Sequence, residues 1–387
     1  MTEAGTAPVV PPAAVGMLGG GQLGRYALMA ARQMGFRTVV LDPDPAAPAG
    51  AVADMHLVAP YDDPEALDHM ASECAVVTTE FENPPAAALT RLGARTRVAP
   101  SATAVAIAQD RIAEKSFLVA HGLPVGQYGV LASVTDVLYA SEHGHLFPAR
   151  LKTARLGYDG KGQAVVDDPA TLRDAWQALG GVPCVLERAL DLQTEVSVVA
   201  ARAHDGAFAA YAVSENAHAD GILDVSVAPA GVPDALAAEA VGHARAIGDA
   251  LAFVGTFAVE FFVTAEGLFV NEIAPRPHNS GHWTLDAART SQFEQQVRAV
   301  CGLPLGDAGM TAGGVAMVNL LGEAWHAGEP AWERALAVPG VSLHLYGKAA
   351  ARPGRKMGHL TAIADTPAEA RRRALSARVA LGYPAPR

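Results

Sequence analysis

Two glutamates within a short apolar stretch are the residues whose types and spacing best fit chemistry. Residues 257–264 and 268–274 alternate and are rich in β-branched and aromatic side chains, which predicts two strands. The intervening Ala-Glu-Gly favours a three-residue hairpin loop with Gly267 in its left-handed position. Such a loop places Glu260 directly opposite Glu272.

Two carboxylates in this arrangement need a counter-charge. Directly opposed residues have Cβ atoms roughly 4.5–5.5 Å apart, and like charges there destabilise a sheet. A divalent cation would keep both ionised, and Mg²⁺ fits because it binds one or two carboxylates together with substrate phosphates. The predicted metal ligands are therefore Glu260, Glu272 and the neighbouring Asn271. An exposed sheet face with two solvated glutamates is the alternative.

The segment after the second strand concentrates hydrogen-bond donors. Residues 274–282 read Ala-Pro-Arg-Pro-His-Asn-Ser-Gly-His, and the two prolines forbid a helix and stiffen the loop. Arg276, His278, Asn279 and Ser280 would lie beside the proposed metal. A metal-binding hairpin next to such a loop suggests phosphoryl chemistry on a small anionic substrate.

A glycine-rich segment has the composition of a phosphate-binding loop. Residues 147–152 are typical of a strand that ends in an inward-facing Lys152, and Gly157, Gly160 and Gly162 follow, interleaved with charged side chains. Glycines allow the backbone to turn its N–H groups toward an anion. The P-loop pattern is absent from this segment. A plain hairpin turn is the alternative.

The N-terminal segment is typical of a doubly wound α/β domain. Residues 14–18 form a predicted strand, Gly19 to Gly24 satisfy G-x-G-x-x-G, and a helix and a second strand ending in Asp42 follow. This pattern imitates a dinucleotide site with its acidic residue. The glycines would alternatively admit a ribose phosphate to the helix N-terminus. Glu80 ends a later strand, where such sheets bind ligands.

Size and composition restrict the class of protein. A chain of 387 residues predicts two or three domains, and a formal charge of −11 argues against a general nucleic-acid surface. The three cysteines lack metal-binding spacing, as expected for reduced cytosolic thiols. Residues 1–13 contain no signal peptide and are interpreted as a loose tail. No run approaches ~18 apolar residues, so we expect no transmembrane helix.

These motifs together resemble the ATP-grasp superfamily, in which two α+β subdomains clamp MgATP. In finer detail the chain is similar, over nearly its whole length, to the 5-(carboxyamino)imidazole ribonucleotide synthases of purine biosynthesis. The strings that carry this similarity are G-G-G-Q-L-G-R, G-Y-D-G-K-G-Q, N-E-I-A-P-R-P-H-N-S-G-H, S-Q-F-E-Q and G-R-K-M-G-H. One departure is Ala154 and Leu156, where the family commonly has Arg and Gly.

The resemblance implies a fold of mixed α/β and α+β class. A Rossmann-like (pre-ATP-grasp) domain would span residues 14–110, and a small C-terminal domain would span residues 311–387. Between them, an ATP-grasp domain at residues 111–310 would consist of an A subdomain, to about residue 190, and a B subdomain.

The resemblance also assigns roles to residues. Contacts to ATP would come from Arg111, Lys152, Gly157, Tyr158, Asp159, Gly160, Lys161, Gly162, Gln163, Glu187, Arg188, Ala189, Leu190, Glu195, His218, Asn271 and Glu272. The ribonucleotide would be held by Gln22, Leu23, Glu80, Lys348, Arg355 and Lys356, with the cations at its phosphate. Bicarbonate and the reacting amine would be surrounded by Tyr158, Asp159, Lys161, Arg276, His278, Asn279 and Ser280.

The implied reaction is the carboxylation of 5-aminoimidazole ribonucleotide, with ATP and Mg²⁺ as cofactors. ATP would phosphorylate bicarbonate to carboxyphosphate, and this intermediate, or CO₂ released from it, would carboxylate the exocyclic amine. The resemblance further implies a cytoplasmic homodimer without nucleic-acid or membrane partners. Two alternatives remain: a related ATP-grasp ligase that uses formate or another acyl donor, and an NAD-dependent dehydrogenase built on the glycine turn.

Overall fold

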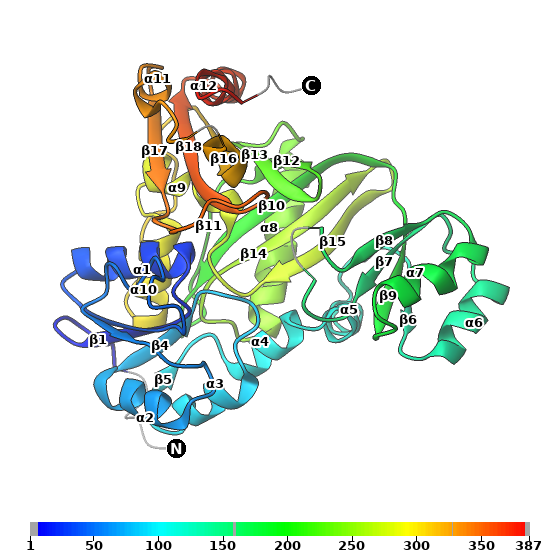
Figure 1. Ribbon diagram of the computed structural model, residues 1–387, viewed down its shortest axis with the longest axis horizontal. Helices are drawn as coiled ribbons and strands as arrows, with labels where there is room; N and C mark the ends of the chain where they lie inside the picture. Colours follow the sequence, from blue (N-terminus) through cyan, green and yellow to red (C-terminus); the bar gives the residue numbers. More distant parts are fainter. Residues whose placement is uncertain (1–6, 158–159, 327, 384–387) are drawn as a thin grey trace.

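Three sheets organise the part of the chain that the computed structural model describes, residues 7–157, 160–326 and 328–383. A long sheet runs through the middle of the molecule, between the N-terminal domain and a smaller sheet (Figure 1). The C-terminal strands lie at the end of the long sheet that is remote from the smaller one (Figure 1).

The N-terminal domain is the doubly wound sheet expected from its alternating strands and helices, which confirms the Rossmann-like prediction. Its parallel strands are, in spatial order, β3 (Met55–Leu57), β2 (Arg37–Leu41), β1 (Ala14–Leu18), β4 (Val76–Thr79) and β5 (Arg97–Val98). Its helices are α1 (Gln22–Gln33), α2 (Pro64–Glu73), α3 (Ala86–Gly93) and α4 (Ala102–Ala108). Parallel strands need such crossover connections, because each must start again at the same edge.

Residues 7–13 are not the loose tail expected from the sequence. The Val9 N–H donates to the carbonyl oxygen of Cys301 (2.7 Å), and the Val9 side chain packs against the core shared by α1 and α10 (Gln292–Cys301). A backbone hydrogen bond and apolar burial therefore fix this segment. Residues 1–6 lie outside the described part of the chain.

The smaller sheet lies within the residues expected for the A subdomain. Its antiparallel strands are, in spatial order, β6 (Tyr128–Leu131), β9 (Cys184–Arg188), β7 (Ala149–Thr153) and β8 (Gln163–Val166). The associated helices are α5 (Arg111–Ala120), α6 (Val134–His143), η2 (Pro169–Thr171) and α7 (Leu172–Ala178). Val137 of α6 and Leu172 of α7 are fully buried against the sheet, so these two helices cover its apolar face.

The central sheet has one apolar and one polar face. Its strands are, in spatial order, β15 (Gly267–Ala274), β14 (Gly255–Thr264), β10 (Leu192–Arg202), β12 (Ser214–Ala219), β13 (Ile222–Ala228), β16 (Gly314–Leu321), β18 (Lys356–Ala364) and β17 (Val341–Leu345), with β11 (Phe208–Ala210) beside β10. Side chains alternate between the faces of a strand. Val196 and Phe261 therefore pack toward α8 (Asp234–Ala250), whereas Glu195 and Glu260 point into a cavity on the other face.

The C-terminal segment continues the central sheet instead of forming a sheet of its own. β16 pairs with β13 in antiparallel register, from Val225 with Val318 to Ala228 with Val315. The elements that cover these strands are η4 (Gly322–Trp325), α11 (Trp332–Leu336) and α12 (Pro367–Ala380). Among the described residues, no helix combines the length and apolarity needed to cross a membrane.

A buried cluster of rings joins the N-terminal domain to the central sheet. The ring of Tyr26 in α1 lies 5.1 Å from that of Phe293 in α10 and 6.1 Å from that of Tyr346, between centroids. The rings of His282 and His359 lie 5.1 Å apart in the same cluster. Burial lowers the pKa of both imidazoles well below the ordinary value, so both stay neutral. These packed rings therefore join the N-terminal domain to the central sheet. The short helices η3 (Asn279–Gly281) and α9 (Thr284–Ala287) connect this cluster to β15.

The glycine turn between β1 and α1 already holds a carboxylate of the protein. Glu80 accepts hydrogen bonds from the backbone N–H groups of Gly21 (2.8 Å), Leu23 (3.2 Å) and Gly24 (3.1 Å). These are the groups with which a helix N-terminus binds phosphate. Because Glu80 occupies them, the expectation that this turn admits a ribose phosphate is wrong.

Asp42 is likewise engaged within the protein. Its carboxylate accepts hydrogen bonds from the Gly20 N–H (2.6 Å) and from the Tyr61 hydroxyl (2.6 Å), and only 8% of the residue is exposed. The acidic residue of a dinucleotide site must instead reach the ribose of its ligand. The turn is therefore held together internally, which argues against the dehydrogenase alternative.

NADH should not bind to this protein. Binding would require Asp42, which is buried, and Glu80, which is half-buried, to release their backbone partners, and losing these hydrogen bonds is costly. The check is a fluorescence titration with micromolar NADH. Binding of MgATP to the same preparation is the positive control. A saturable NADH signal would contradict this assignment.

Candidate active site

A cavity of about 1100 Å³ opens where the three sheets meet. Its wall is formed by the start of α1 and the segment after β4 in the N-terminal domain, the A subdomain, the polar face of the central sheet and the loop between β17 and β18. Every predicted site residue in the described part of the chain lines this cavity, except Ser280. Tyr158 and Asp159 lie outside the described residues. The cavity therefore brings together residues separated by more than 300 positions in the sequence, from Gln22 to Lys356.

The hairpin of β14 and β15 has a shorter turn than the sequence predicted. Thr264 pairs with Gly267, so two residues form the turn where three were expected. The φ of Gly267 is +132°, which favours glycine but places it in the strand. On its own, this difference would move Glu260 one residue away from Glu272.

A β-bulge restores the predicted pairing. The register shifts between Glu260, which pairs with Glu272, and Phe261, which pairs with Val270, so Asn271 is an extra residue in β15. A bulge redirects side chains locally, and Asn271 and Glu272 both line the cavity although they are consecutive. Glu260 and Glu272 therefore lie opposite each other because the shorter turn and the bulge compensate.

Each of these glutamates has a basic partner. Arg111 Nη1 donates to Glu272 Oε2 (2.9 Å), and His278 Nε2 lies 3.1 Å from Glu260 Oε1. Burial alone would raise the pKa of Glu260, but the hydrogen bond from His278 and neighbouring positive groups hold this pKa below its ordinary value. Glu260 is therefore ionised at neutral pH.

Two lysines surround Glu187 on the A-subdomain side of the cavity. Lys152 Nζ lies 2.6 Å from Glu187 Oε2 and 3.3 Å from Asn271 Oδ1, and Lys115 Nζ lies 3.3 Å from Glu187 Oε1. Burial opposes ionisation of Glu187, but the two lysines lower its pKa to about 2. The lysines are thus fixed in the wall as cations. The sequence prediction missed Lys115, although it follows Arg111 by four residues and so shares its face of the helix.

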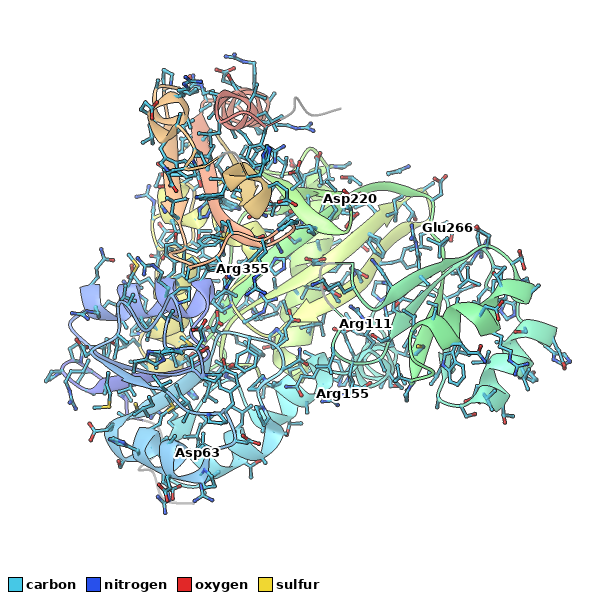
Figure 2. The ribbon with its side chains drawn as sticks, viewed as in Figure 1. Asp63, Arg111, Arg155, Asp220, Glu266 and Arg355 are labelled. Carbon is cyan, nitrogen blue, oxygen red and sulfur yellow. The ribbon has the colours of Figure 1, made fainter. Side chains whose placement is uncertain are left out.

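The glycine-rich segment reaches from the A subdomain to the central sheet. Gly160 has a φ of +76°, and a Cβ atom built on it would lie 3.2 Å from the carbonyl oxygen of Asp220 in the turn between β12 and β13. Arg155 lies at the start of this segment. In Figure 2, Arg155 and Asp220 lie on opposite sides of the centre of the molecule. A glycine at position 160 therefore permits the close approach of two backbones over the cavity.

Leu156 adopts a conformation that a side chain disfavours. Its φ is +63°, in the left-handed region, and 72% of the residue is exposed. A non-glycine residue in this region costs roughly 1–2 kcal/mol. The family that the sequence resembles commonly has a glycine at this position, which would remove this cost. The neighbouring Ala154 is buried without strain.

The cations predicted for the ribonucleotide phosphate lie on the loop between β17 and β18. Lys348 Nζ donates to the carbonyl oxygen of Lys356 (2.7 Å), and Arg355 Nη1 donates to that of Ala350 (2.8 Å). Figure 2 shows Arg355 on the C-terminal side and Arg111 on the A-subdomain side of the molecule's middle. Both line the same cavity, which therefore has a basic group at each end.

The donor-rich loop after β15 connects the two ends of the cavity. Arg276 forms an ion pair with Glu82 of the N-terminal domain, and His278 contacts Glu260 in the hairpin. Gln292 accepts from the His278 N–H (2.8 Å) and donates to its carbonyl oxygen (2.8 Å). Glu82 follows the same predicted strand as Glu80, at the end where such sheets bind ligands, with a solvated loop as the alternative, but no role was assigned to it. Gln292 was not predicted as a site residue; the S-Q-F-E-Q string contained it without indicating its role.

Ser280 does not belong to the group that would surround bicarbonate. It is fully buried, and its hydroxyl lies 2.8 Å from His278 Nδ1 and 2.7 Å from the Ser197 hydroxyl. The prediction that Ser280 contacts a small substrate is therefore wrong in this structure. The helical turn at Asn279 directs consecutive side chains apart, so Asn279 lines the cavity while Ser280 lies beneath it.

Comparison with protein families divides the chain into three matching regions. Residues 13–109 match the "Ribonucleotide synthetase preATP-grasp domain", residues 116–293 match the "ATP-grasp domain", and residues 315–373 match the "Phosphoribosylaminoimidazole carboxylase C-terminal domain". These three matches cover the cavity wall except for the start of α5, which carries Arg111, Glu114 and Lys115.

Individual relatives match along most of their length. The chain is 44% identical over 348 residues to N5-carboxyaminoimidazole ribonucleotide synthase of Pseudomonas aeruginosa, covering 90% of this chain and 93% of that protein. It is 42% identical over 356 residues to the enzyme of that name from Brucella melitensis, covering 91% and 97%. N5-carboxyaminoimidazole and 5-(carboxyamino)imidazole are two names for one group.

Solved structures give the same result. An N5-carboxyaminoimidazole ribonucleotide synthetase from Thermus thermophilus superimposes with a TM-score of 0.87 at 42% identity, covering 95% of this chain and 98% of that one. The enzyme from Aspergillus clavatus, in complex with ADP and 5-aminoimidazole ribonucleotide, superimposes with a TM-score of 0.86 at 29% identity, covering 96% and 98%. This chain therefore belongs to the N5-carboxyaminoimidazole ribonucleotide synthase family of ATP-grasp ligases.

Proposed function

We propose that this chain uses ATP and bicarbonate to carboxylate the exocyclic amine of 5-aminoimidazole ribonucleotide, through carboxyphosphate, in purine biosynthesis. The observation that carries the proposal is one cavity with two chemically distinct ends. Paired carboxylates and fixed lysines at one end suit a nucleotide with its metal, and the cations at positions 348, 355 and 356 suit a second phosphate. The loop with Arg276 and His278 contacts both sides and supports a reaction between the two ligands.

The donor set of the hairpin fits Mg²⁺. Glu260 and Glu272 lie opposite each other, and each has a second carboxylate oxygen besides the one that contacts His278 or Arg111. Oxygen ligands of this kind are those that Mg²⁺ prefers, together with substrate phosphates. The bound ion would neutralise charge on the phosphates of ATP. The side-chain oxygen of Asn271 is the third candidate ligand. In this structure it accepts a hydrogen bond from Lys152.

The protein's own contribution to the first step is position and charge. Phosphoryl transfer needs little covalent chemistry from an enzyme, and it is accelerated by cations fixed around the transferred group. Lys152 and Arg111 are held in place by Glu187 and Glu272, so they need no rearrangement when a polyphosphate arrives. The glycine-rich segment from 154 to 163 would cover the site and exclude water, which protects carboxyphosphate from hydrolysis.

The second step requires the ribonucleotide amine to meet the activated carboxyl group. The phosphate of the ribonucleotide would bind Arg355 and the neighbouring lysines, because arginine supplies a bidentate donor and lysine a point charge. Burial raises the pKa of Glu80, and its hydrogen bonds to Gly21 and Gly24 lower it in part. Glu80 and the side chain of Gln22 would then face the ribose or the imidazole from the N-terminal domain.

ADP release should require both bicarbonate and 5-aminoimidazole ribonucleotide for its full rate. Without bicarbonate, carboxyphosphate cannot form, and without the ribonucleotide it has no acceptor. ATP consumption should be slow in both cases. A coupled ADP assay with each substrate omitted in turn measures this. Formate should not replace bicarbonate; full activity with formate would instead support the related-ligase alternative.

Glu272→Gln should lower ATP turnover at least about 100-fold, the size typical of removing one group that stabilises a transition-state charge. The amide keeps the shape of the side chain but removes the charge that would hold the metal. The matched control is Glu266→Gln, since Glu266 is exposed in the turn of the same hairpin (Figure 2). Steady-state kinetics, with circular dichroism to verify folding, provide the measurement. Normal turnover in Glu272→Gln would mean that the pair is structural.

Arg355→Ala should raise the KM for 5-aminoimidazole ribonucleotide roughly 10- to 100-fold, the range expected for a lost charged hydrogen bond. The KM for ATP should change little, because the ATP contacts lie at the other end of the cavity. The control is Arg371→Ala, which removes an exposed arginine of α12. A parallel rise of both constants, or a rise in that for ATP alone, would refute the assignment of the two ends.

The family resemblance also leads us to propose a homodimer in the cytoplasm. All three cysteines are buried and unpaired by disulfides, as is usual in a reducing compartment. Sedimentation equilibrium of the purified chain tests the oligomeric state independently of activity.

A further inference from the structure

A chain of buried hydrogen bonds runs beneath the cavity toward His278. Ser226, Asn216, Ser197 and Ser280 follow one another across β13, β12, β10 and the loop after β15, and none is more than 7% exposed. The register explains their contact, because Asn216 is the cross-strand partner of Ser226 and Ser197 is that of Glu260. The chain ends at His278.

The chemistry of the asparagine gives this chain a direction. The Ser226 hydroxyl donates to Asn216 Oδ1 (2.7 Å), and Asn216 Nδ2 donates to Ser197 Oγ (2.9 Å). An amide nitrogen only donates and an amide oxygen only accepts. Ser197 therefore receives a proton from one side and has its own hydroxyl proton to give to the other.

The same direction continues to the imidazole. Ser197 Oγ lies 2.7 Å from Ser280 Oγ, and Ser280 Oγ lies 2.8 Å from His278 Nδ1, which is also 3.3 Å from the Ser280 N–H. The Ser280 N–H donates to Nδ1, and the chain adds the Ser280 hydroxyl as a second donor, so Nδ1 is an acceptor. Neutral imidazole then carries its hydrogen on Nε2, which lies 3.1 Å from Glu260 Oε1. An ionised carboxylate only accepts hydrogen bonds, so Glu260 also requires the hydrogen of the imidazole to be on Nε2.

Burying a chain of polar groups in a sheet demands more of the sequence than burying apolar side chains there. Buried polar groups must all be satisfied, and one missing partner costs more than an apolar side chain would. The same strands pack Val196 and Val198 on their other face, so an apolar solution is available to this sheet. The polar residues occur on the face that leads to Glu260.

We propose that Ser197, Asn216 and Ser226 are positioning residues that fix the Nε2–H tautomer and the ring orientation of His278, and through it the carboxylate of Glu260. The effect on turnover rests on the proposed function, in which Glu260 holds the metal. The tautomer itself is a property of the free protein and does not depend on the reaction.

The decisive variant is Asn216→Asp, which has nearly the same shape. Aspartate accepts from both Ser226 and Ser197, so the proton of Ser197 turns away from Ser280 and the chain loses its direction. In ¹⁵N-histidine NMR spectra of the protein without metal or substrates, Nδ1 of His278 should be unprotonated in the parent and partly protonated in the variant, in which the Ser280 N–H is the one donor to Nδ1 that remains. His278→Asn identifies the resonance among those of the 13 histidines.

Two further variants keep the test decisive if Asn216→Asp does not fold. Ser226→Ala releases the asparagine amide to rotate and should shift the tautomer in part, and kcat should fall about tenfold while the KM for ATP changes little. Ser214→Ala is the matched control, because Ser214 is buried on the same strand and hydrogen-bonds with Trp283 Nε1 (3.0 Å) and the Ser280 carbonyl oxygen (3.5 Å) but with no side chain of the hydrogen-bond chain. It should leave the His278 tautomer as in the parent.

The outcomes separate this proposal from the proposed function. An unprotonated Nδ1 in both Asn216→Asp and Ser226→Ala, or the same shift in Ser214→Ala, would overturn the positioning role. A shifted tautomer in a protein that does not carboxylate the ribonucleotide would support the positioning role and reject the reaction instead.

Discussion

The opposed carboxylates of Glu260 and Glu272 create the requirement that the rest of the site meets. Above an apolar core, two such groups stay ionised only if positive charge is close. Arg111, from α5, supplies this charge to Glu272, and His278, from the loop after β15, donates a hydrogen bond to Glu260. Charge balance thus draws separate parts of the chain to one hairpin. The same need for positive charge suits the metal ion and nucleotide proposed for this site.

Sequence patterns predicted the chemistry of the site better than they predicted its local geometry. The pairing of Glu260 with Glu272 was correct although the turn was one residue too long, because alternation does not reveal a bulge at Asn271. The glycine turn was correctly placed, but only the fold shows that Glu80, 56 residues beyond Gly24, occupies its N–H groups. Ser280 was assigned to the cavity because a string of donors says nothing about which of them point inward.

The arrangement of sheets determines which parts of the site are fixed together. The paired glutamates and the cation-bearing loop at 348–356 stand on one continuous sheet, and the ring cluster around Tyr26 joins the N-terminal domain to it. The A subdomain has its own sheet and meets the others mainly through α5 and the glycine-rich segment. We therefore expect the A subdomain to be the part that moves when the cavity opens and closes.

The pairing of β13 with β16 has a consequence for how this protein is made. During synthesis β13 emerges well before β16, so its hydrogen-bonding edge stays open until the C-terminal strands have left the ribosome. An open strand edge is a template for pairing with another chain. Nascent chains that stall between these strands would then be prone to join one another, and pairing with β16 is what closes this edge of β13.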